Sequence, residues 1–139
     1  MKKLFLIFLA VAALALSLSG CVKTGGAPDP EKIVPARETL IENLKAKGYE
    51  IEELSTVEGS GLSVDRVIAS DGDKFIDIVY GLSSEEAMEI FDLFRGMYPD
   101  GYYILARNGN YVYCVSDRST FKNAGFKSKD NVGTQYING

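Results

Sequence analysis

The stretch YYILARNGNYVYCVS, residues 102–116, sets the fold, because it has the pattern of two strands joined by a tight turn. Asn108-Gly109 lies at its centre, between two apolar runs. An Asn-Gly pair in this context is the strongest short-range signal for a two-residue β-hairpin turn. We therefore predict strands over residues 102–107 and 110–116.

Both faces of this hairpin are too apolar to be simply solvated. Strand alternation places one set of side chains together: Tyr102, Ile104, Ala106, Tyr111, Tyr113 and Val115. The opposite set is Tyr103, Leu105, Arg107, Asn110, Val112 and Cys114. The smaller Leu105, Val112 and Cys114 suit packing against helices. Tyr102, Tyr111 and Tyr113 are then predicted to form a partly exposed binding platform, since tyrosine is favoured at recognition surfaces. The alternative is that these rings cover the edge of the core or pack under the C-terminal tail.

The segments on either side of the hairpin alternate between helical and strand patterns. Helices are predicted over residues 35–47, 84–98 and 118–124, the second opened by the capping box Ser83-Ser84-Glu85-Glu86. A strand over 49–57 and a hairpin of 62–70 with 74–81, around Asp71-Gly72, complete the set. Pairing Ser70 with Asp73 would place Arg66 opposite Asp77 as an exposed pair. The order α-β-β-β-α-β-β-α predicts an α+β fold, an antiparallel sheet with helices packed on one face.

Residue content limits the possible chemistry. The chain has no histidine, which excludes Ser-His-Asp and Cys-His catalysis and most zinc sites. Asp71 and Asp73 together supply too few oxygens for calcium, and no cofactor is predicted. Cys114 is expected to be a buried, inert strand residue. A hydrolase built on carboxylates alone would have only Glu50, Glu52, Asp65 or Asp77 as candidates, so we predict that the protein is not an enzyme.

The N-terminal segment has the layout of a secretory signal peptide. Lys2 and Lys3 precede an apolar run over residues 4–16, and small residues follow over 17–20. Thirteen helical residues rise only about 20 Å, which is too short for a bilayer core of about 30 Å. A retained transmembrane helix is therefore the weaker alternative.

Leu18-Ser19-Gly20-Cys21 resembles the lipobox of bacterial lipoproteins, and the resemblance covers residues 1–22 only. It implies that residues 1–20 are cleaved and that Cys21 carries a diacylglyceryl group, whose two acyl chains anchor the protein stably in a lipid bilayer. The implied location is the outer face of a bacterial membrane. The alternative is a plain secreted protein with a chance cysteine.

The mature chain would divide into a flexible tether over 21–34, one α+β domain over 35–126 and a loose polar tail over 127–139. Loss of Lys2 and Lys3 leaves 13 basic and 19 acidic residues. This acidic balance argues against nucleic acid and anionic lipid headgroups as partners.

The leading functional prediction is a membrane-anchored interaction module that binds a protein or an envelope polymer. The alternatives are an accessory or inhibitory subunit of an exported enzyme, and a carboxylate-dependent cell-wall hydrolase. A flat aromatic sheet face would favour the interaction module, and an acidic convex edge would favour the subunit. A cleft with two convergent acidic groups would favour the hydrolase.

Overall fold

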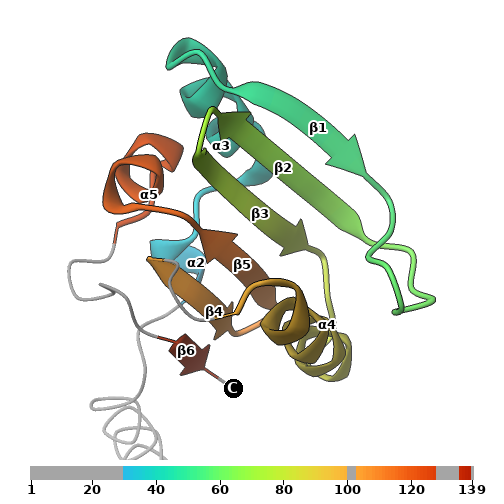
Figure 1. Ribbon diagram of the computed structural model, residues 1–139. Helices are drawn as coiled ribbons and strands as arrows, with labels where there is room; N and C mark the ends of the chain where they lie inside the picture. The colour runs from blue at the N-terminus through green and yellow to red at the C-terminus, as the bar shows by residue number, and fades with distance from the viewer. Residues whose placement is uncertain (1–29, 100–102, 128–134, 139) are drawn as a thin grey trace, which may run out of the picture.

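One six-stranded sheet runs through the domain in the order β1-β2-β3-β5-β4-β6 (Figure 1). The computed structural model describes residues 30–99, 103–127 and 135–138. The first five strands pair antiparallel, whereas β6 runs parallel to β4. The strands are β1 Glu50–Leu54, β2 Asp65–Asp71, β3 Lys74–Tyr80, β4 Ile104–Asn108, β5 Tyr111–Val115 and β6 Gln135–Asn138.

The helices confirm the predicted α+β class and the order α-β-β-β-α-β-β-α. They are α2 Pro30–Ile33, α3 Arg37–Ala46, α4 Ser84–Met97 and α5 Arg118–Ala124. The short α2 precedes the predicted series, and β6 follows it. Each of the three predicted helices begins and ends within two residues of its expected bounds.

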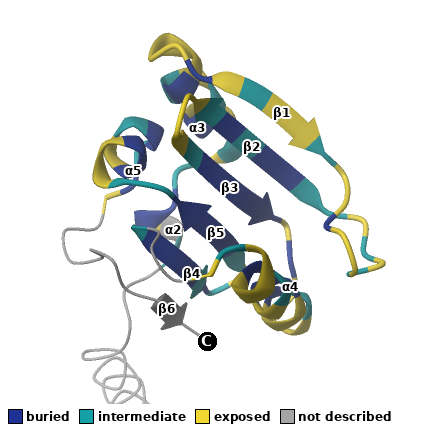
Figure 2. Cartoon of the chain, in the orientation of Figure 1, coloured by how far each residue is buried: buried dark blue, intermediate teal, exposed yellow. Residues whose placement is uncertain are grey.

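The helices lie on both faces of the sheet, which corrects the expectation that they would share one face. α3 and α5 cover one face through a core that includes Leu40, Leu44 and Phe121. α4 covers the other through a separate core that includes Ile90 and Phe94. The physical reason lies in the central strands: the run from Val112 to Val115 is buried at every position, as in a strand covered on both sides (Figure 2).

Side-chain caps define where α4 and α5 begin. The predicted capping box of α4 is present: the Glu86 backbone N–H donates to Ser83 Oγ at 3.2 Å, and the Ser83 N–H donates to Glu86 Oε2 at 2.8 Å. At α5, the Thr120 N–H donates to Asp117 Oδ1 at 2.8 Å. These bonds satisfy backbone donors that have no partner within the helix.

Both hairpin turns lie one residue later than predicted. Asp71 pairs with Lys74 and Asn108 with Tyr111, so the turn residues are Gly72-Asp73 and Gly109-Asn110. Each glycine has φ +60° at the first turn position, which is the conformation of a type II′ turn. Because both strands of a hairpin shift by one residue, cross-strand partners change by two and every side chain keeps its predicted face.

The ends of the domain also differ from the predicted boundaries. α2 falls within the predicted tether. Ile33 at its end and Val34 directly after it are buried in the core shared with α3 and α5. The Lys127 backbone N–H donates to the Ile33 carbonyl at 3.2 Å, joining the two ends. β6 lies within the predicted loose tail, so that part of the tail adds an edge strand.

The membrane anchor predicted from the sequence lies outside the described residues, because these begin at Pro30 and Cys21 precedes it. Among the described helices, none is long and apolar enough to cross a bilayer.

Candidate functional site

The three tyrosines of the predicted binding platform do not form an exposed surface together. Tyr113 is fully buried in the core between the sheet and α5. Tyr111 is partly buried and packs edge-on against Tyr80, with ring centroids 5.8 Å apart. Tyr102 lies outside the described residues. The platform prediction is therefore wrong for Tyr113, and its alternative, rings that cover the core, describes both tyrosines that the structure places.

Aromatic side chains after the hairpin explain the burial of Tyr113. The rings of Tyr113 and Phe126 have centroids 4.9 Å apart, and Phe126 stacks on Phe121 of α5 at 4.5 Å. α5 thus brings its apolar side down on the tyrosine face of the hairpin. The sequence contains a signal for this burial. Phe121 lies in the predicted helix over 118–124 and Phe126 follows it, and both rings need an apolar surface to cover.

Beneath α4 lies a buried polar network that the sequence analysis placed at the surface. Arg66 Nε and Nη2 donate to the two carboxylate oxygens of Asp77 at 2.8 and 2.6 Å. The Tyr98 hydroxyl donates to Asp77 Oδ2 at 2.7 Å. Asp77 is fully buried, and the Arg66 guanidinium lies over the Phe94 ring of α4. The predicted pair exists, but it is buried and lies diagonally, because Asp77 pairs with Ile68.

These contacts indicate that the network has a structural role. The hydrogen bond from Arg66 to Asp77 is the main cause of the raised pKa of Arg66. Burial raises the pKa of Tyr98, and the neighbouring Asp77 charge adds to the effect. Both carboxylate oxygens of Asp77 therefore accept hydrogen bonds, from a positively charged partner and from a neutral hydroxyl. The carboxylate is not open to accept a proton from a substrate. Cys114 lies beside it in β5, where burial raises the pKa of the thiol to about 12.

The other carboxylates named as possible catalytic groups do not converge with Asp77. Asp65 accepts a hydrogen bond from Arg37 Nε at 2.8 Å. Glu50 and Glu52 are exposed on the edge strand β1. Within the described ranges, no group of three or more metal-binding side chains comes together.

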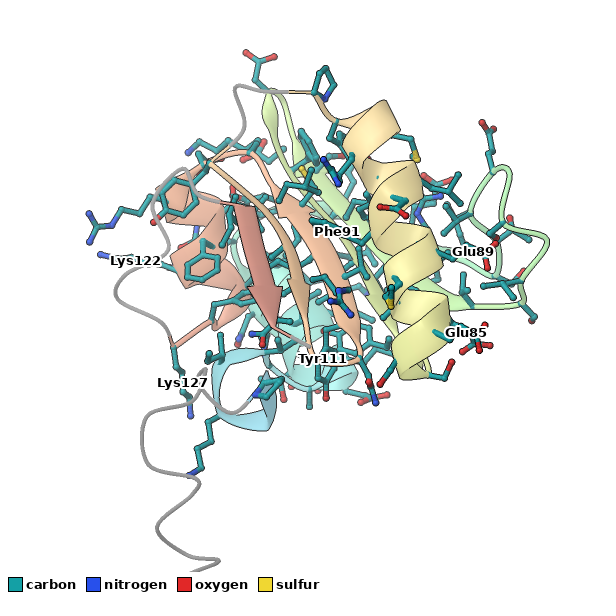
Figure 3. The ribbon with its side chains drawn as sticks, turned by 90° about the horizontal axis from the view of Figure 1, so that it is seen from below. Glu85, Glu89, Phe91, Tyr111, Lys122 and Lys127 are labelled. Atoms are coloured by element: carbon teal, nitrogen blue, oxygen red, sulfur yellow. The ribbon has the colours of Figure 1, made fainter. Side chains whose placement is uncertain are left out.

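The outer face of α4 forms an exposed acidic surface around a methionine. Glu85, Glu89 and Asp92 are exposed along the helix, and Met88 between them is 55% exposed. Figure 3 shows Glu85 and Glu89 pointing away from the sheet, with Phe91 on the inner side of the same helix. We call Glu85, Met88, Glu89 and Asp92 the acidic face. Methionine is adaptable in contacts, and acidic neighbours select a cationic partner.

Basic side chains gather on the side of the molecule where α5 and α2 lie. Arg118 and Lys122 of α5 line a shallow depression together with Ser119 and Asn123. Lys122 and Lys127 lie away from the acidic face in Figure 3. Lys32 of α2 is exposed close to Lys127, since the Lys127 N–H binds the neighbouring Ile33 carbonyl. We call Lys32, Arg118, Lys122 and Lys127 the basic face.

Net charge alone does not predict this separation of charge. Residues 49–99 carry 12 acidic and 3 basic side chains, whereas residues 103–127 carry 4 basic and 1 acidic. That single acid, Asp117, is occupied as the cap of α5 and also accepts hydrogen bonds from Ser116 and Thr120. Charge counted by segment would have revealed the asymmetry.

Comparison with protein-family models, with curated proteins and with solved structures found no match to this chain.

Proposed function

We propose that this protein is a bacterial lipoprotein, anchored through lipid on Cys21, whose α+β domain is an interaction module on the outer face of a membrane. The lipobox-like Leu18-Ser19-Gly20-Cys21 supports the anchor. The start of α2 supports a short tether: Pro30 is nine residues from Cys21, a reach of roughly 30 Å at full extension. The domain is thus held close to the bilayer.

The acidic face is the surface through which this module binds its partner. Exposed Met88 supplies apolar contact, and Glu85 and Glu89 supply most of the charge, because Asp92 lies 3.9 Å from Arg95 of the same helix. An acidic surface attracts a cationic one and repels a polyanion. The partner class is therefore a protein with a basic surface rather than an anionic envelope polymer.

The observation that carries this proposal is the charge separation across the sheet. The acidic face lies on α4, whereas α2, from which the tether leaves, lies on the opposite face with α3 and α5. A tether on one face leaves the other open to a partner. The acidic convex edge expected of an accessory or inhibitory subunit is not what carries this charge, since α4 covers a face of the sheet. We therefore favour an interaction module that binds through the acidic face over one that binds through an aromatic platform.

The anchor is tested by mass spectrometry of the protein purified from membranes of its native host. We expect a chain that begins at Cys21 and carries the mass of a diacylglyceryl group. A mature chain without fatty acid, or one that retains residues 1–20, would refute the anchor.

The acidic face is tested by photo-cross-linking in intact cells, with a photoreactive residue in place of Met88. We expect one discrete basic protein to be cross-linked, and the charge reversal Glu85→Lys with Glu89→Lys to abolish the product. The matched control is Glu50→Lys with Glu52→Lys on β1, which makes the same charge change elsewhere and should leave the product unchanged. Equal loss in both variants would reject α4 as the binding face.

A further inference from the structure

The basic face is charged and exposed. Its four side chains are all exposed. The ion pairs found among the described residues use Arg37, Arg66 and Arg95, and none includes a residue of the basic face. The neighbouring α3 carries Glu38 and Glu42 but also Lys45 and Lys47, so it does not neutralise the patch.

The position of the tether gives this patch a partner. α2 and α5 share one core on the same face of the sheet, and Lys32 lies two residues after Pro30, so the basic face adjoins the point where the tether joins the domain. With the proposed anchor nine residues from Pro30, the tether keeps the basic face within reach of the bilayer. An anionic leaflet attracts lysine and arginine side chains that lie within about 10 Å of it, because salt screens the attraction at greater distances.

We propose that Lys32, Arg118, Lys122 and Lys127 rest on anionic lipid headgroups and so orient the anchored domain with α4 facing away from the bilayer. This inference rests on the proposed anchor and names the surface that the domain turns to the membrane. It also reverses the expectation drawn from net charge: the whole mature chain is acidic, but the surface that meets the headgroups is basic. Repulsion of the acidic face by the same leaflet favours the same orientation.

The test uses the mature lipidated protein in lipid vesicles and measures which side of the domain touches headgroups. A fluorophore is attached at Ser119→Cys on α5 or, in a second variant, at Met88→Cys on α4; the native Cys114 is buried and does not compete. Quenching by headgroup-labelled lipid is compared between phosphatidylcholine vesicles and vesicles with about one-third phosphatidylglycerol. We expect quenching at position 119 to increase in anionic vesicles and to be lost in high salt, with position 88 unquenched in both.

Charge variants identify the residues responsible. Lys122→Gln with Lys127→Gln should lower the preference of position 119 for anionic over phosphatidylcholine vesicles by a factor on the order of ten. The matched control, Lys45→Gln with Lys47→Gln, removes the same charge from exposed positions at the end of α3, outside both the basic face and the acidic face, and should leave the preference unchanged. An equal loss in both pairs would show that net charge alone acts, and would overturn the basic face.

Failure of the anchor and failure of the orientation give different results. A protein that does not float with pure phosphatidylcholine vesicles lacks a working anchor. A protein that floats but shows equal quenching at positions 119 and 88 in anionic vesicles has an anchor and no preferred orientation, which overturns the inference. If a soluble glycerophosphate polymer abolishes the preference at equal ionic strength, the basic face belongs to an envelope polyanion and the lipid assignment is wrong.

Discussion

Asp77 shows how strongly the environment of one residue changes its role. In the sequence it is one of 19 acidic residues, and its pattern predicts an exposed pair with Arg66. In the fold it is fully buried and receives hydrogen bonds from Arg66 and Tyr98. A buried charge is tolerated only when it is paired and hydrogen-bonded, so these residues depend on one another.

Removing one member of this network should destabilise the protein more than removing all of it. Asp77→Asn leaves Arg66 buried without its counter-charge, and we expect a loss of about 3–5 kcal/mol. The triple variant Arg66→Met, Asp77→Leu and Tyr98→Phe should lose less, because it leaves no buried charge without a partner. The measurement is the free energy of unfolding from urea titration.

The control for this series is Arg37→Met, which removes an arginine that is 26% exposed and should cost only about 0–1 kcal/mol. A triple variant that is less stable than Asp77→Asn would show that the network contributes net stabilisation beyond satisfying its own charges.

The two hairpins differ in what their turns contact. Gly72 and Gly109 occupy the same turn position with the same φ of +60°. A Cβ added at Gly72 would meet nothing within 4 Å, whereas one at Gly109 would lie 2.6 Å from Cγ of Pro30. The start of α2 therefore packs directly against the β4–β5 turn, which sets where the tether leaves the domain.

Comparing alanine at these two glycines isolates that contact. Both Gly72→Ala and Gly109→Ala incur the strain of positive φ, on the order of 1 kcal/mol. We expect Gly109→Ala to be further destabilised, because α2 must move away from the turn. The measurement is the difference in midpoint of thermal or urea unfolding, together with hydrogen exchange at the Val34 amide, which bonds to the Pro30 carbonyl. Equal effects of the two substitutions would mean that α2 does not hold Pro30 against the turn.

The domain as a whole consists of one sheet between two cores. α3 and α5 close one core and α4 closes the other, and the central strands β3, β5 and β4 belong to both. Loss of either core would expose apolar side chains on shared strands. We therefore expect the two sides to unfold in one cooperative transition.

Cys114 reports on that transition, because its thiol lies in the core under α4. In the native protein we expect no reaction with a thiol reagent at pH 8, and labelling only through unfolding. The thiol also makes stability depend on pH: in the unfolded chain it ionises near pH 9, but in the folded protein its pKa is raised to about 12. Its contribution is fully present below pH 9 and falls as the pH rises toward 12, by at most about 1.4 kcal/mol per pH unit.

Cys114→Ala should remove this contribution and give a shallower fall of stability above pH 9 than the native chain, measured by urea titration at several pH values. A free energy of opening from labelling well below that from urea would reveal local opening of α4 and contradict a single transition.

Much of the local structure followed from short-range patterns. The capping box and the glycine-centred hairpins act within a few residues, so their signals are complete in the sequence. Even the turn positions, wrong by one residue, did not disturb which side chains share a face, because strand alternation has a period of two.

Long-range packing decided what the local patterns left open. Whether Tyr113 or Cys114 meets solvent depends on which helix covers each face, and that depends on contacts between segments far apart in the chain. Likewise, Asp77 is buried because α4 closes over β3, and β6 exists as a strand only because β4 offers an open edge. The opposed acidic and basic faces arise in the same way: net charge is a property of composition, whereas the surface that a charge occupies is set when the sheet brings distant segments together.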